Sequence, residues 1–120
     1  MGTLETATAE ELTQRLYRIG EEKQEVEGQQ RELRRLEEEF QTHLQQKNRL
    51  LDEISHTWQK GQMAHRTTDR MLQIRKEEQG LMERFWEERE TTKKAHQQLE
   101  AKEEAVYYQR KAAYEKEATS

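Results

Sequence analysis

Histidine is the residue type in this chain best suited to bind a metal or move a proton. The chain has no cysteine, and its imidazole side chains are those of His43, His56, His65 and His96. His56 and His65 have Glu53 and Asp69 nearby, and imidazole with carboxylate is a donor set that binds transition metals. Their spacing does not match H-E-x-x-H or a comparable motif. We therefore expect solvated histidines near a turn, and no metal site.

Carboxylates are abundant enough to suggest acid/base catalysis. They occur in the runs Glu37-Glu38-Glu39, Glu77-Glu78 and Glu87-Glu88. On a helix, such runs normally form the solvated face. The sequence has no Gly-rich phosphate loop and no G-x-S-x-G nucleophile motif. We expect no catalytic residues and no cofactor, hence a protein that is not an enzyme.

Composition limits the elements that could position any site. Of 120 residues, 38% are charged and only 31% hydrophobic, with no proline and five glycines. A globular domain has more apolar and fewer charged residues, and sheets need more turn residues than this chain has. The fold class predicted is all-α. A net charge of −4 gives no case for nucleic acid, and no apolar run is long enough for a membrane span or a signal peptide.

A heptad repeat runs through the first half of the chain. Its d positions are Leu12, Ile19, Val26, Leu33, Phe40, Lys47 and Ile54, and its a positions are Leu16, Lys23, Gln30, Glu37, Leu44, Leu51 and Trp58. Ten of these 14 residues are apolar, which is typical of a long helix with a coiled-coil seam. Thr8 and Glu11 match a capping box, which places the start of this helix near residue 8.

The second half has a looser heptad in its own phase. Its a positions are Ala64, Met71, Glu78, Phe85, Thr92, Leu99, Val106 and Ala113, and its apolar d positions are Ile74, Leu81 and Ala95. Weak helix formers are densest between the two phases. The prediction is one long antiparallel, coiled-coil-like two-helix hairpin over residues 1–120, with helices at about 8–58 and 67–116, a turn at about 59–66 and frayed termini.

Two residues are predicted to make the turn. Trp58 would fill the open end of the coiled coil, and Gly61 would supply the positive φ that ends the first helix. A turn at this place puts Lys47 opposite Ile74 and Phe40 opposite Leu81. The seam is underfilled in the middle of the hairpin, so we expect the isolated chain to be marginally stable and to need another chain.

The segment Trp58-Gln59-Lys60-Gly61 resembles the W-x-G turn of the small helical hairpins of type VII secretion, with one residue inserted. The chain also shares their size, mid-chain break, and lack of proline, cysteine and signal peptide. It has no Y-x-x-x-D or F-x-x-x-D export motif, since Tyr107 is followed four residues later by Lys111. In this it is similar to the small α-helical proteins that accompany LXG toxins in Gram-positive bacteria.

That resemblance implies a targeting factor or chaperone for a secreted toxin. Its partners would be the toxin's N-terminal helical domain and a second small helical hairpin. The implied location is cytoplasmic, with export alongside the partner and without a cleavable signal. Separately, the candidates for helix-on-helix recognition are six apolar residues beside the seam and the seam residue Phe85: Leu36, Leu50, Met82, Phe85, Trp86, Tyr107 and Tyr108.

Two other readings remain open at the level of sequence. One is a coiled-coil stalk or escort protein of a flagellar or type III export apparatus. The other is a structural homodimer, an antiparallel four-helix bundle made from two hairpins. The polar a positions Lys23, Gln30 and Glu37 suit a mixed assembly better than a symmetric one, because they require complementary charges from another chain.

Overall fold

The chain forms two long helices. The computed structural model describes residues 7–57 and 61–119, except the side chain of Met63. Helix α1 spans Ala9–Thr57 and helix α2 spans Gln62–Thr119, and the described residues contain no other regular element. The prediction of an all-α fold made of two long antiparallel helices is confirmed.

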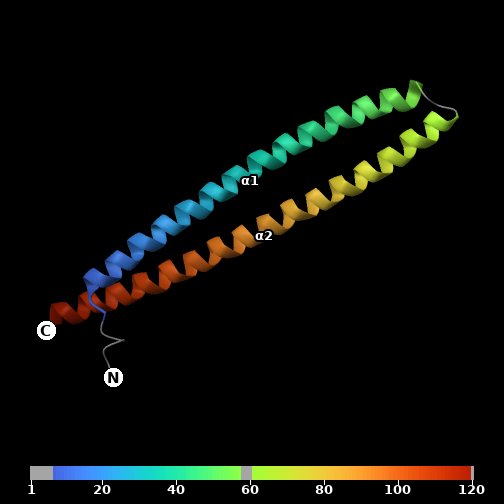
Figure 1. The fold of residues 1–120 in the computed structure, drawn as a ribbon. Helices are drawn as coiled ribbons and strands as arrows, with labels where there is room; N and C mark the ends of the chain where they lie inside the picture. The colour runs from blue at the N-terminus through green and yellow to red at the C-terminus, as the bar shows by residue number, and fades with distance from the viewer. Residues whose placement is uncertain (1–6, 58–60, 120) are drawn as a thin grey trace. The chain divides into compact units, whose positions relative to one another are not determined.

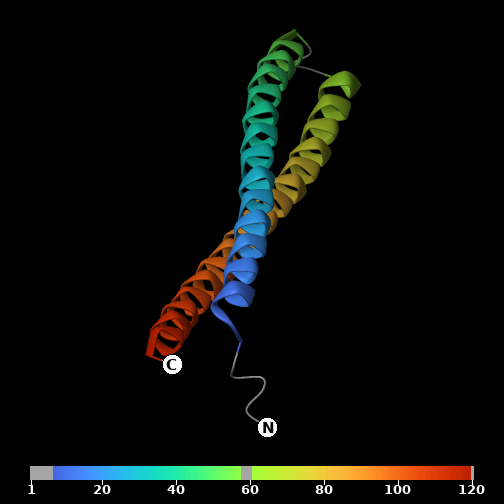
Figure 2. The same ribbon diagram turned by 90° about the vertical axis from the view of Figure 1, so that its left-hand side faces the viewer.

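The two helices contribute to two compact units. Unit 1 combines the first part of α1, up to Gln30, with the part of α2 from Thr91 onward, and unit 2 contains Arg31–Glu90. Within each unit, the α1 and α2 segments run side by side in opposite directions (Figures 1 and 2). Each unit therefore consists of one antiparallel helix pair.

The predicted heptad positions are the ones that the helices cover. On α1, every a and d residue from Leu12 to Ile54 is buried or half-buried, and on α2 the same holds for all the predicted a residues. Leu81, a predicted d residue, is the exception at 41% exposed. The seam is thin, because only Ala9, Leu12, Ile19 and Leu99 are buried among the described hydrophobic residues. Trp58 lies outside the described residues.

Two side chains cap the start of α1. The Thr8 hydroxyl accepts a hydrogen bond from the Glu11 amide at 3.2 Å, as the capping box predicts. The amide of Ala9 donates to Oε1 of Glu117 on α2, also at 3.2 Å. A carboxylate at a helix N-terminus satisfies a free amide and opposes the positive end of the helix dipole. In unit 1, a side chain of α2 therefore caps the start of α1 and links the two helices.

Gly61 has the predicted positive φ, at +91°, but it acts at the start of α2 and not at the end of α1. Helix α1 ends at Thr57, whereas the Gly61 carbonyl accepts from the His65 amide at 3.4 Å. The predicted turn at 59–66 was too long, because Gln62 and the four residues after it are helical. Of these residues all but His65 are strong helix formers, and Ala64 is half-buried in the seam, so the helix begins directly after Gly61.

The register between the helices differs from the prediction by about one helical turn. Phe40 packs on Phe85, with ring centroids 5.6 Å apart, whereas the predicted register places it opposite Leu81. Lys47 forms an ion pair with Glu78, four residues beyond the predicted Ile74. An ammonium group facing only an aliphatic side chain would be desolvated without a partner. The observed register gives it a carboxylate.

Candidate partner-binding surfaces

The exposed large apolar and aromatic side chains are the main candidate functional feature of the described residues. They range from 40% to 72% exposed and comprise Tyr17, Leu36, Leu50, Leu72, Leu81, Met82, Trp86, Tyr107, Tyr108 and Tyr114. Single exposed apolar residues are ordinary on protein surfaces, whereas aligned groups of them mark interaction sites. What matters is how the helices align these residues.

In unit 2, one flank of the helix pair has leucines on both helices. Leu36, His43 and Leu50 are seven residues apart on α1, so they form one row along that helix. On α2 the matching row contains Arg70, Glu77 and Arg84, with Leu81 between it and the seam. We call these seven residues the leucine flank. His43, Glu77 and Leu81 line the same hollow, which places the two rows on the same side of the pair.

This hollow opens between the helices of unit 2. Its volume is about 180 Å³, and its lining residues are Phe40, His43, Leu44, Lys47, Ile74, Glu77, Glu78 and Leu81. Four of these residues are apolar; among the charged ones, Lys47 pairs with Glu78, and Glu77 adds a second carboxylate. An apolar cavity of about 150 Å³ has room for benzene. The hollow can therefore accept one large apolar side chain from outside the pair.

Met82 and Trp86 lie on the other flank of α2. At about 100° per residue, they are about 60° and 100° round the helix from Phe85 in one sense. Leu81 and Arg84 are about 40° and 100° round it in the opposite sense. From the sequence alone, Leu36, Leu50, Met82 and Trp86 belong to one set of candidate partner-binding residues. The structure separates them into two flanks, so a single partner helix cannot cover all of them at once.

Phe85, also a candidate for partner binding, lies in the seam. It is half-buried, and its ring packs at a tilt on Phe40. Aromatic pairs of this geometry contribute about 0.5 to 1.5 kcal/mol beyond the area they bury. In this structure Phe85 joins α1 to α2 within unit 2.

Unit 1 contains a separate aromatic group on α2. The rings of Tyr107 and Tyr108 meet edge to face at 5.7 Å. The guanidinium of Arg110 lies 5.7 Å from the ring of Tyr107 and 5.9 Å from that of Tyr114. Tyr107 also borders a hollow with Leu16, Lys23 and three glutamates. Tyr and Arg are enriched among residues that dominate binding energy at interfaces.

Charged pairs cross between the helices at polar seam positions. Lys23 pairs with Glu103 at 3.2 Å in unit 1. In unit 2, Nε of Arg89 lies 3.1 Å from Oε1 of Glu37, a buried atom that accepts no well-directed hydrogen bond. The predicted need for complementary charges at Lys23 and Glu37 is therefore met within the chain.

His96 in unit 1 has a carboxylate at each ring nitrogen. Nε2 lies 3.1 Å from Glu27 on α1, and Nδ1 lies 3.3 Å from Glu100 on α2. The contact between Nε2 and Glu27 is a hydrogen bond that crosses from α2 to α1. His96 thereby links the two helices of unit 1, a role that its sequence position did not indicate.

An ion-pair cluster occupies the outer edge of α1 in unit 2. Arg35 pairs with Glu32 and with Glu39. The hydrogen bond from Arg35 to Glu32 and the charges of both carboxylates raise the pKa of the guanidinium above its ordinary value. Arginine is fully protonated at neutral pH in any case. Arg35 offsets one of the two negative charges, so this cluster keeps a net charge of −1.

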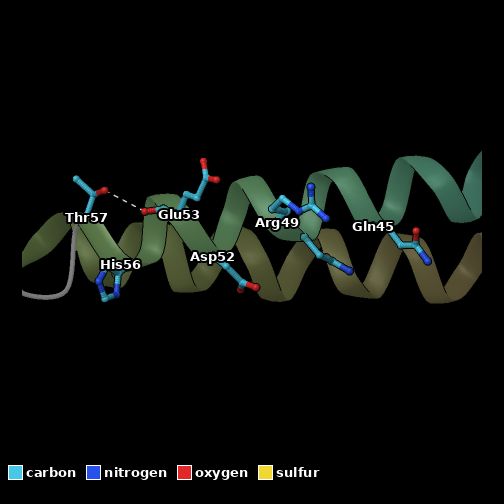
Figure 3. Close-up of a pocket in the computed structure, with 7 residues that line it drawn as sticks. Gln45, Arg49, Asp52, Glu53, His56 and Thr57 are labelled. Carbon is cyan, nitrogen blue, oxygen red and sulfur yellow. Dashed lines mark hydrogen bonds between the residues drawn. The ribbon is translucent and has the colours of Figure 1, made fainter.

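Another hollow is lined by residues of α1, which include Gln45, Arg49, Asp52, Glu53, His56 and Thr57 (Figure 3). The dashed line in Figure 3 is the hydrogen bond from the Thr57 hydroxyl to the Glu53 carbonyl, 2.9 Å long. Among residues 7–57 and 61–119, no three His, Asp or Glu side chains gather as a metal site would require. Nor does either helix, over its described length, have a stretch suited to crossing a bilayer.

The fold and its surfaces define a class: a two-helix coiled-coil hairpin with exposed apolar rows of the kind that bind protein partners. The chain belongs to the DUF3958 family, described as a protein of unknown function, whose model matches residues 8–113. No curated protein and no solved structure matches the chain significantly.

Sequence reasoning missed part of the leucine flank. Leu81 was assigned to the seam because it falls at a d position, yet it is 41% exposed. His43 was treated only as a candidate for metal or proton chemistry, although it stands seven residues from both Leu36 and Leu50. The seven-residue spacing was the available signal, but choosing between flanks requires knowing which sides of the two helices coincide.

Proposed function

We propose that this protein is a non-catalytic binding partner of the helical domain of a secreted, LXG-type toxin and helps to deliver that toxin to a type VII secretion system. The observation that carries the proposal is the exposure of large apolar residues beside a thin seam, exemplified by Trp86 at 57% and Leu50 at 56%. Covering such residues with another helix stabilises the complex by roughly 25 cal/mol per Å² of apolar surface buried.

The choice of a toxin as partner rests on the resemblance of the turn to the W-x-G hairpins. Gly61, at the end of the resembling segment, has the positive φ that favours glycine. The fold of two long antiparallel helices is compatible with the same class. The polar seam residues pair within the chain, so the partner is expected to bind the flanks and not to complete the seam.

Co-expression with the helical N-terminal domain of a toxin encoded beside the gene tests this proposal. Tagged full-length chain should retain that domain through purification. Trp86→Ala and Tyr107→Ala should each reduce the retained amount, because both residues are large and exposed. Gln98→Ala, also at an exposed position, is the matched control and should have no effect. Absence of any retained toxin domain with the unmodified chain would refute the proposed function.

A further inference from the structure

We infer that the leucine flank of unit 2 is the docking site for one acidic amphipathic helix of a different protein, which inserts an apolar side chain into the hollow between α1 and α2. The inference rests on the proposed function, since it gives the partner's chemistry and the place where it binds. It differs from that function in committing to one of the two flanks.

The shape of the flank fits a helix. Leu36 and Leu50 stand two heptads apart on α1, and Leu81 stands on α2 beside the hollow. A helix lying along this side would meet apolar side chains from both rows and a hollow between them, as in knobs-into-holes packing. Its own apolar residues must recur at heptad spacing to follow Leu36, His43 and Leu50.

The charge of the flank defines the helix further. Arg70 and Arg84 have no ion pair within the part of the chain that the structure describes, whereas on the α1 edge Arg35 pairs with both Glu32 and Glu39, and the three side chains together carry a net charge of −1. Glu77 lies between the two arginines and offsets one of them, so the α2 edge remains net positive. The two arginines are fourteen residues apart, or about 21 Å at the helical rise. A partner helix with two carboxylates at the same spacing, on the side of its apolar stripe that faces α2, matches them.

A binding experiment with designed peptides tests this directly. The probe is a synthetic amphipathic helix of about three heptads, with leucine at the seam positions and two Glu residues fourteen apart beside the stripe. The matched probe has Lys at those two positions. Fluorescence anisotropy with the full chain should show about fivefold to tenfold tighter binding of the Glu peptide, from two surface charge pairs. The double variant Arg70→Glu, Arg84→Glu should prefer the Lys peptide, and the control Arg75→Glu, on the other flank, should not reverse the preference.

The apolar part of the flank is tested separately. Leu36→Asp with Leu50→Asp should weaken binding of the Glu peptide at least about tenfold, while circular dichroism stays unchanged because both leucines are already exposed. Leu72→Asp is the matched control, since Leu72 is 59% exposed on the other flank of α2. Equal affinity for the Glu and Lys peptides, or greater loss with Leu72→Asp than with the double variant, would overturn the inference.

Three further results distinguish docking of a partner helix on the leucine flank from self-association and from the proposed function. If the wild-type chain sediments as a dimer that the Leu36, Leu50 double variant dissociates, a second copy covers the flank and the inference is wrong. If the double variant still retains the toxin domain in co-purification, the proposed function stands and the leucine flank is not its site. Binding of the Glu peptide without any binding of the toxin domain would refute only the proposed function.

Discussion

Substituting alanine at two glycines should move the stability of this protein in opposite directions. Gly61 precedes α2 with a φ of +91°, whereas Gly80 lies in the interior of α2. A Cβ built at either position meets no heavy atom within 4 Å. Neither alanine would therefore clash with a neighbouring atom, and the two substitutions differ only in the backbone conformation of the residue that is replaced.

The magnitudes follow from that conformation. A residue with a Cβ pays about 1 to 2 kcal/mol in the left-handed region, so Gly61→Ala should lower the free energy of unfolding by that amount. Alanine inside a helix is favoured over glycine by about 0.5 to 1 kcal/mol, so Gly80→Ala should raise it. The two variants should differ by roughly 1.5 to 3 kcal/mol.

Urea unfolding followed by far-ultraviolet circular dichroism measures both variants against the wild type. Gly61→Asn is a useful third variant, because asparagine tolerates the left-handed region better than alanine, and it should fall between wild type and Gly61→Ala. If Gly61→Ala unfolds at the wild-type urea concentration, or if Gly80→Ala is the more destabilised of the two, the reasoning about the turn is wrong.

Three further substitutions test the ends, the seam and the register. Thr8→Ala removes the hydroxyl that caps α1 and should cost about 1 kcal/mol, measurable by urea unfolding and recovered in Thr8→Asp. Phe40→Ala removes the ring packed on Phe85 and should lower the unfolding free energy by about 2 to 3 kcal/mol, less than for a fully buried ring; a loss below about 0.5 kcal/mol would contradict this packing. Lys47→Glu places like charges at the contact with Glu78, so it should lower the melting temperature, and adding Glu78→Lys should restore it; lack of rescue would argue against the observed register.

The seam could be predicted from the sequence because it depends on local periodicity. Leu12, Ile19 and Leu99 fall at heptad positions, and each is buried. Even the polar seam residues Lys23 and Glu37 are at least half-buried at the predicted places. Burial on a long helix repeats with the pitch of that helix, so each position can be read from its neighbours in the chain.

The register could not be predicted in the same way. Sliding one helix past the other by a turn keeps apolar rows facing each other, so the apolar pattern hardly distinguishes the two alignments. The choice depends on pairs between distant residues, Lys47 with Glu78 and Phe40 with Phe85. The same dependence explains why Leu36 and Trp86 could not be assigned to separate flanks from sequence, since that requires the relative rotation of both helices.

The central claim is that this hairpin binds the helical domain of another protein through its exposed rows. Light scattering during size-exclusion chromatography of the full chain mixed with the toxin's N-terminal helical domain tests it most directly. The claim predicts one peak whose mass is at least the sum of one copy of each chain, and a shift back to separate peaks when Leu36 and Leu50 are both replaced by Asp. Two separate peaks with the unmodified chain, each at the mass of its own component, would contradict it.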